Sequence, residues 1–173
     1  MQEPVSTVLP RRPRTWTPKA IPFGMLVLLL GLWAIFAPLV GGYFGFGFYS
    51  DATWQFPGKW WELHFVGGAA TAAGGFMLMT PARGWGALGR LLAFLGGAWL
   101  VVGWAFYPVW ANGTIEPYGS EFWRGMRWLG QLLGPGGLSL FFAGVANGLF
   151  MRRTFVEQAP PVPLETTQVT VPE

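Results

Sequence analysis

The segment 21–42 reads IPFGMLVLLLGLWAIFAPLVGG, and it decides the fold class because no charged residue interrupts it. A helix of about 20 apolar residues crosses the hydrocarbon core of a bilayer. A cleaved signal peptide has a shorter apolar region, of about 7–15 residues, followed by a small-residue cleavage site. This segment is longer and continues into the glycine-rich aromatic sequence Tyr43-Phe44-Gly45. We therefore expect a retained transmembrane helix.

The rest of the chain shares this apolar character. Of its 173 residues, 52% are apolar and 11% are charged, whereas a soluble domain carries about 25% charged residues. Further apolar segments lie at about 61–79, 88–109 and 129–151. The sequence predicts an all-α polytopic membrane protein with four transmembrane helices within residues 19–153. The polar, proline-rich segments 1–18 and 154–173 are expected to be disordered cytoplasmic tails.

Two loops, 44–59 and 110–127, lie on one side of the predicted bundle. In the second loop, apolar residues alternate with charged ones at the spacing of a short amphipathic helix, which we expect to lie in the membrane interface. Its apolar positions are Phe122, Trp123, Met126 and Trp128, and its charged positions are Glu121, Arg124 and Arg127.

The basic residues predict the orientation, because cytoplasmic loops carry an excess of Lys and Arg. Lys59, Arg124 and Arg127 lie on the side of the two loops. Eight basic residues lie on the other side: Arg11, Arg12, Arg14, Lys19, Arg83, Arg90, Arg152 and Arg153. We expect both termini in the cytoplasm and the protein in the cell (inner, plasma) membrane.

The two halves of the chain resemble each other. Gly31-Leu32-Trp33 recurs as Gly97-Ala98-Trp99, and each leads to a proline near the outer boundary, Pro38 or Pro108. Each half then has an outer loop and a glycine-rich second helix. The sequence predicts two related hairpins in a parallel repeat, since both would start on the same side of the membrane.

These motifs resemble the SPW-repeat family of small bacterial and archaeal integral membrane proteins. In that repeat a helix with Gly-x-Trp leads to Ser-Pro-Trp, and a second helix opens with Trp and reaches a Gly, as Trp61-Glu62-Leu63-His64-Phe65-Val66-Gly67 does. The resemblance covers about residues 21–80, and more loosely 88–151. This chain has Ala37-Pro38-Leu39 and Tyr107-Pro108-Val109 in place of Ser-Pro-Trp. The family implies a membrane fold and no established activity.

The sequence favours no self-contained catalytic site. It has no cysteine, which excludes thiolate metal sites, iron–sulfur clusters and cysteine nucleophiles. It also lacks a Ser–His–Asp pattern, a phosphate-binding loop with its lysine and a cluster of metal ligands. The net charge of +3 is explained by the topogenic basic residues, so nucleic acid is not an expected partner. We expect a protein that is not an enzyme and has no cofactor or metal.

His64 is the only histidine. A histidine in a membrane helix can bind a haem or a chlorin or relay protons, but near a helix mouth it can equally bond to a carbonyl group or water. Trp33, Trp99 and Trp104 lie deeper than an interfacial belt requires. They are candidates to line a site for a quinone or pigment, and filling of the bundle core is the alternative.

Five further residues are candidates for contact with a ligand or partner. Arg124 and Arg127 are spaced to form an anion or headgroup clamp or the polar face of a surface helix. Glu62 is placed to solvate a helix mouth. Asn147, within Gly144-x-x-x-Gly148, and Thr71 are polar residues at membrane depth, where such residues face protein.

The function expected from these features is that of a non-catalytic membrane protein. An accessory, scaffold or assembly subunit is favoured by the closely spaced glycines, with the lipid bilayer and either a second copy or a larger membrane complex as partners. A small-molecule carrier or channel, with Asn147, Thr71 and the two prolines along its path, is one alternative. A redox protein associated with a pigment or a quinone, using His64 and the tryptophans, is another.

Overall fold

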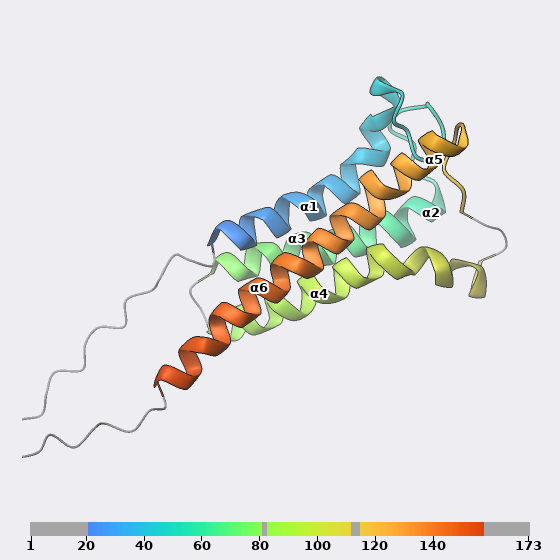
Figure 1. Cartoon of the computed structure of the whole chain (residues 1–173). Coiled ribbons are helices and arrows are strands. Elements are labelled where there is room, and N and C mark those ends of the chain that lie inside the picture. The colour runs from blue at the N-terminus through green and yellow to red at the C-terminus, as the bar shows by residue number, and fades with distance from the viewer. Residues whose placement is uncertain (1–20, 81–82, 112–114, 158–173) are drawn as a thin grey trace, which may run out of the picture.

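A computed structural model describes residues 21–80, 83–111 and 115–157, and every regular element in these ranges is helical. The predicted tail 1–18 and residues 158–173 of the predicted tail 154–173 lie outside the described residues, as do four of the eight topogenic basic residues, Arg11, Arg12, Arg14 and Lys19. Four rods run alongside one another (Figure 1). Their elements are α1 (Ile21–Val40) with the 3₁₀ turn η2 (Gly41–Phe44); α2 (Gly58–Trp60), the π-helix η3 (Trp61–Phe65) and α3 (Val66–Met79); α4 (Arg83–Phe106) with the 3₁₀ turn η4 (Tyr107–Val109); and α5 (Glu121–Trp128), the π-helix η5 (Leu129–Leu133) and α6 (Gly134–Glu157).

Each of α1 and α4 packs against both α3 and α6, so α3 and α6 lie across the bundle from each other. The start of α1 and the end of α6 lie at one end of the bundle, and the loops that follow α1 and α4 lie at the other (Figure 1). We call the end with these two loops the outer end.

Glycines allow the helices of each hairpin to approach closely. A Cβ on Gly68 would lie 2.8 Å from the Gly31 carbonyl oxygen, and a Cβ on Gly136 would lie 2.8 Å from the Gly97 carbonyl oxygen. Such a contact is too short for any side chain, so α1 meets α3, and α4 meets α6, along glycine-lined seams. Close approach of this kind is how small residues support helix packing in membranes.

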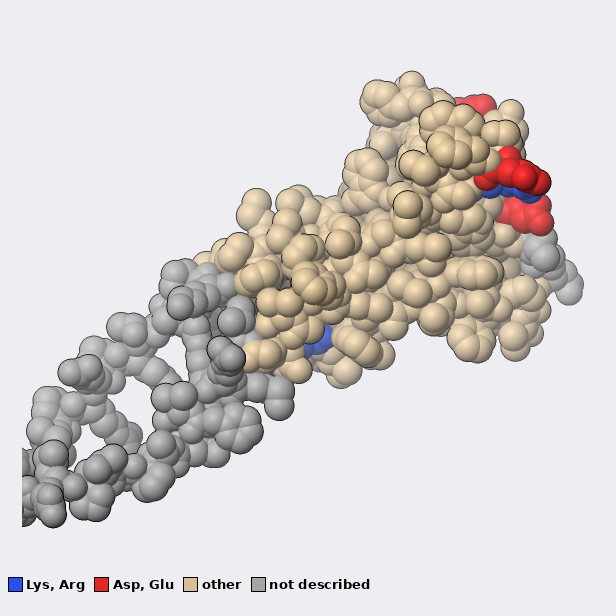
Figure 2. All heavy atoms as spheres, in the orientation of Figure 1, with Lys and Arg blue, Asp and Glu red and all other residues tan. Residues whose placement is uncertain are grey.

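The outward-facing side chains are apolar over most of the bundle. Three helices are long and apolar enough to cross a membrane: Ile21–Phe44, Gly84–Val109 and Glu121–Gly148. Figure 2 shows the carboxylates gathered at the outer end and a face without visible charge along the middle of the bundle. The described chain is therefore a helical membrane protein.

The second outer loop differs from the prediction. We expected a short helix in the interface, separate from a fourth span starting at residue 129. Instead α5 continues through η5 into α6 without a break in helical geometry. A π-helix has more residues in each turn than an α-helix. The helix therefore continues through η5, but side chains beyond η5 lie on a different face from the one that an uninterrupted α-helix would give them. The last helix also extends to Glu157, into the range predicted to be a disordered tail.

Candidate functional site at the outer end

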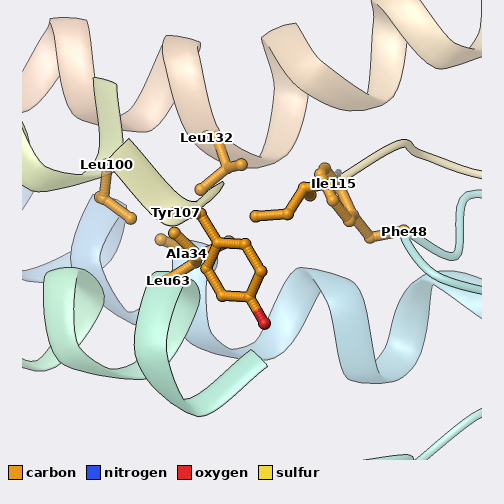
Figure 3. Packing of buried hydrophobic residues seen from close by; sticks show 7 residues of the cluster. All are labelled: Ala34, Phe48, Leu63, Leu100, Tyr107, Ile115 and Leu132. Carbon is orange, nitrogen blue, oxygen red and sulfur yellow. The ribbon is translucent and has the colours of Figure 1, made fainter. Parts of the chain in front are cut away.

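The first outer loop folds back into the mouth of the bundle. We call its residues 45–51 the cap loop. Phe48 is fully buried and packs in a cluster with residues from all four rods and from the second loop: Ala34, Leu63, Leu100, Tyr107, Ile115 and Leu132 (Figure 3). The edge of its ring meets Trp128 on α5, with 5.5 Å between ring centroids. The cap loop thus closes the outer end of the helix bundle with an aromatic side chain.

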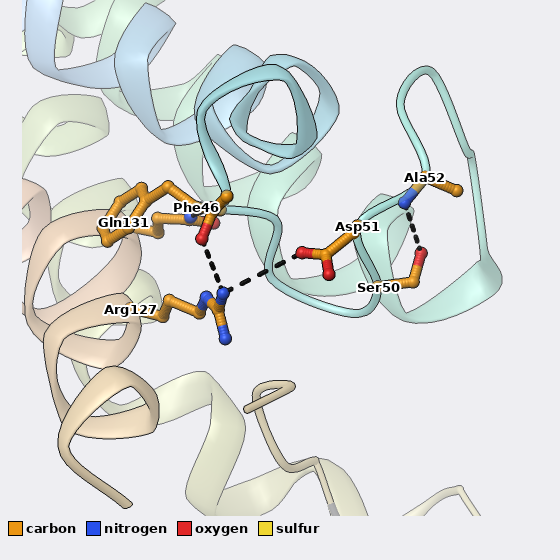
Figure 4. Close-up of polar contacts among 7 residues, drawn as sticks. Phe46, Ser50, Asp51, Ala52, Arg127 and Gln131 are labelled. Atoms are coloured by element: carbon orange, nitrogen blue, oxygen red, sulfur yellow. Dashed lines mark hydrogen bonds and ion pairs between the residues drawn. The ribbon is translucent and has the colours of Figure 1, made fainter. Parts of the chain in front are cut away.

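The second hairpin holds the backbone of the cap loop. Arg127 donates to the Gly45 carbonyl oxygen at 2.7 Å, and the Gln131 amide donates to the Phe46 carbonyl oxygen (Figure 4). The Tyr118 N–H donates to the Phe48 carbonyl oxygen at 2.9 Å. Arg127 and Gln131 are four residues apart, on either side of the start of η5. These bonds satisfy carbonyl groups that the loop carries into the bundle, where water is scarce.

Arg127 is a buried cation surrounded by loop residues. Its guanidinium lies 4.0 Å from the Asp51 carboxylate and 5.5 Å from the centre of the Tyr118 ring. Gly119, with φ of 107°, passes so close to it that a Cβ at this position would clash with the guanidinium. Arg124 instead points outward and pairs with Glu116 at 3.5 Å. The two arginines are therefore not brought together as one anion clamp.

His64 is fully buried in η3 and bonds to the cap loop. Its Nδ1 lies 3.1 Å from the Tyr49 hydroxyl, and its ring packs against Phe48 with 4.8 Å between centroids. Its Nε2 has no hydrogen-bond partner among the described residues. Burial, reinforced by the nearby Tyr107 and Glu62, raises the pKa of Tyr49 far above its ordinary value. Tyr49 therefore keeps its proton at any physiological pH.

Two of the candidate tryptophans bond to the π-helices across the bundle. Trp33 on α1 donates its indole N–H to the Gly130 carbonyl oxygen of η5 at 2.7 Å. Trp99 on α4 donates to the Glu62 carbonyl oxygen of η3 at 2.8 Å. Each indole thus bonds a π-helix of the other hairpin. Because a π-helix disturbs the usual pairing of backbone groups, these indoles provide hydrogen-bond donors to carbonyls within the widened turns.

The tryptophans do not converge on His64 as a common binding pocket. Trp104 packs on Trp128, with ring centroids 4.9 Å apart, and Trp33 lies on a different helix, about half exposed. Trp99 stacks on Trp110, whose indole N–H donates to the Glu62 carboxylate at 3.0 Å. Glu62 therefore accepts one indole through its backbone and another through its side chain, which links η3 to the outer end of α4.

Five buried polar side chains have at least one atom without a hydrogen-bond partner in the described structure. They are His64 and Thr71 on the rod of α3, and Arg127, Gln131 and Ser139 on the rod of α6. Thr71 lies against Gly96 of α4, and Ser139 lies against the next residue, Gly97. The two hydroxyl groups are therefore on different sides of α4. Gln131, Ser139 and Tyr49 were missed by the sequence analysis. The first two could have been noticed as uncharged polar residues within an apolar span, but nothing local marks Tyr49.

Asn147 lies on the exposed face of α6, away from Thr71. Gly137, Gly144 and Gly148 on this helix have no heavy atom within 4 Å of the position a Cβ would take. The sequence predicts that Gly144 and Gly148 pack against another helix, and no helix of the described chain makes that contact. Pro38 is buried near the end of α1, whereas Pro108 is exposed in η4.

The chemistry available at the outer end is hydrogen bonding by buried neutral groups, together with one buried guanidinium. No group of three or more His, Asp or Glu side chains in the described ranges is placed to hold a metal ion. Comparisons with protein-family models, curated proteins and solved structures found no match to this chain.

Proposed function

We propose that the protein is a non-catalytic accessory or scaffold subunit that associates within the membrane, through α6, with another membrane protein or with a second copy of itself. The observation that carries this proposal is that most glycines of the bundle contact a neighbouring helix, whereas three glycines of α6 do not. Those of α1, α3 and α4 largely meet neighbouring helices, whereas Gly137, Gly144 and Gly148 form an open strip on α6. Residues spaced by seven and four share one helix face, and small residues there allow a second helix to approach.

The polar group beside this strip supports the same function. Asn147 is exposed on α6 next to Gly148, within the apolar stretch that extends to that glycine. An amide exposed to lipid is unfavourable, and such groups usually face protein. A partner helix lying on the strip would offer Asn147 hydrogen-bonding groups and cover the open glycines.

The proposal includes an arrangement of the chain in the cell membrane. All four rods cross the bilayer, both termini are cytoplasmic, and the two hairpins are related repeats of the SPW type. Two pairs of contacts support this relationship. Gly31 meets Gly68 as Gly97 meets Gly136, and the Trp33 bond to η5 corresponds to the Trp99 bond to η3.

Photo-crosslinking in the native membrane tests the proposal. A photoreactive residue at position 144 should capture a defined membrane protein or a second copy, whereas the same residue at position 84 should not. Gly84 is the matched control because it is also a helical glycine with nothing near its Cβ position. Gly137→Ile should weaken co-purification of the captured protein. A lone monomer with no specific crosslink at position 144 would refute the proposal.

A second candidate function, a carrier or channel for a small polar molecule, is favoured by the unpartnered interior groups. Thr71 and Ser139 present buried hydroxyl groups on both sides of α4, where a passing polar solute would find hydrogen bonds. Flux into liposomes should fall in the double variant Thr71→Val, Ser139→Ala. It should not change in Asn147→Leu, because Asn147 faces outward. Equal flux in the wild type and the double variant would rule out this path.

A further inference from the structure

The cap loop is fixed in the mouth of the bundle by the buried ring of Phe48 and by a few polar contacts. Its backbone bonds to Arg127, Gln131 and Tyr118, and its Tyr49 side chain bonds to His64. At the first end of the loop, Gly45 has φ of 64° and nothing near its Cβ position. A segment held in this way can leave its site if one anchor changes, because its peptide groups can bond to water instead.

His64 is the one anchor that can change charge near neutral pH, since an unperturbed histidine titrates at about 6.5. It is fully buried, and the ionisable side chains around its pair with Tyr49 are Tyr107 from η4 and Glu62 from η3 itself. The Glu62 carboxylate accepts the Trp110 indole, and Asp51 on the cap loop faces Arg127. Within the described ranges His64 bonds to no carboxylate, because its Nδ1 faces the Tyr49 hydroxyl and its Nε2 has no hydrogen-bond partner. From α1 and α4 the cluster around it receives apolar residues, Ala34 and Leu100.

A positive charge on His64 would therefore be buried without a counter-ion. Burial disfavours the charged imidazole, and Phe48 and Tyr49 cover the ring on the side of the cap loop. Displacement of these two side chains would bring water to the imidazolium. The other anchors do not change in the same way: Arg127 stays charged and Gln131 stays neutral across this pH range.

We propose that the cap loop is an acid-released latch, in which protonation of His64 moves Phe48 and Tyr49 out of the mouth of the bundle. The released state binds one proton more than the seated state. By linkage, the preference for the seated state is greatest above the ordinary histidine value of about 6.5 and weakens as the pH falls below it. The ratio of seated to released molecules should fall by up to about tenfold for each pH unit in that range.

Distance measurements between spin labels test the latch, and the chain offers a clean background because it has no cysteine. Labels at Ser50→Cys on the cap loop and Phe122→Cys on α5 report their separation by pulsed electron resonance in lipid nanodiscs. At pH 8 we expect one distance population, and at pH 5 a second, longer one. Phe122 suits the label because it is largely exposed.

The matched variant is His64→Gln, which keeps a neutral hydrogen-bonding group beside Tyr49. The latch predicts one distance population at both pH values in this variant. A change in distance that persists in His64→Gln, or no change in the wild type, would overturn the proposal.

A second measurement covers the case in which His64→Gln does not fold. Because His64 is the only histidine, its imidazole signal in the nuclear magnetic resonance spectrum of the wild type is unambiguous. Its titration midpoint should coincide with the midpoint of the distance change. Two separate midpoints would show that another group releases the loop.

Discussion

Arg127 is a buried cation whose bonds connect two loops. Replacing it with leucine would leave the Gly45 carbonyl without its donor and Asp51 without its ion pair. Asp51 is half exposed, so the main loss is the hydrogen bond from the charged group to the Gly45 carbonyl, which contributes about 1.5–3 kcal/mol. We expect Arg127→Leu to lower the free energy of unfolding by about that amount, measured by titration with a denaturing detergent.

Arg124 provides the control for this change. It lies three residues earlier on the same helix, and its ion pair with Glu116 is exposed. Exposed pairs contribute roughly 0–1 kcal/mol, so Arg124→Leu should have a small effect. Equal losses in the two variants would contradict the role assigned to Arg127.

We expect Trp33 and Trp99 to stabilise the bundle through hydrogen bonds from their indole N–H groups. Replacing either with phenylalanine keeps an aromatic ring but removes the bond to a π-helix carbonyl. Each change should lower the free energy of unfolding by about 1 kcal/mol. Trp104→Phe should cost less, because Trp104 contacts Trp128 only through its ring. A larger loss for Trp104→Phe would argue against indole hydrogen bonding as the reason for these residues.

For single residues, the sequence predicted which side chains were unusual but not what they contact. His64, Trp33 and Trp99 stood out by residue type and depth. Their partners lie 15, 97 and 37 residues away along the chain. Two of these partners are backbone carbonyls, which no side-chain pattern can mark. Arg127 was read as a surface residue because its buried position depends on how the loops fold around α5.

The helices separate into faces that tolerate a larger side chain and faces that do not. A Cβ on Gly75 in α3 would lie 2.7 Å from the Gly24 carbonyl oxygen of α1, whereas Gly144 in α6 has open space. We expect Gly75→Val to lower the free energy of unfolding by about 3 kcal/mol, since overpacking forces the backbones apart. Gly144→Val should fold normally, as judged by the elution profile and unfolding of the purified monomer. Similar losses in both variants would contradict this division of faces.

The positions of the helices could be predicted far better than their ends. Uninterrupted apolar length predicted α1, α3, α4 and α6, because a membrane helix must satisfy its own backbone. The π-helices η3 and η5 could not be predicted, since an extra residue in one helical turn leaves no mark in composition. The charged residues of α5 therefore indicated a separate surface helix, although the structure continues them into α6.

For the whole molecule, the proposed orientation makes a prediction about access from the two sides of the membrane. Single cysteines can be introduced at Phe44 in the outer loop and at Gly84 near the start of α4, both exposed positions. A thiol reagent that cannot cross membranes should label Phe44→Cys in intact cells. It should label Gly84→Cys only after permeabilisation, because the positive-inside rule places the α3–α4 turn in the cytoplasm. Labelling of both in intact cells would mean that α3 does not cross the bilayer.

The exchanged indole bonds have a consequence for the ancestry and synthesis of the chain. In each case the donor lies on the first helix of one hairpin and the acceptor on the second helix of the other. A symmetric dimer of a single hairpin would make the same bond twice across its axis, so gene fusion of such a dimer would preserve both bonds. During insertion from the ribosome, the Glu62 carbonyl has no indole donor until Trp99 has been synthesised. The Trp33 indole likewise has no acceptor until Gly130 has been synthesised. A truncated chain that ended after Met79 would thus enter the membrane with the Trp33 indole and the Glu62 carbonyl without the partners they have in the complete bundle.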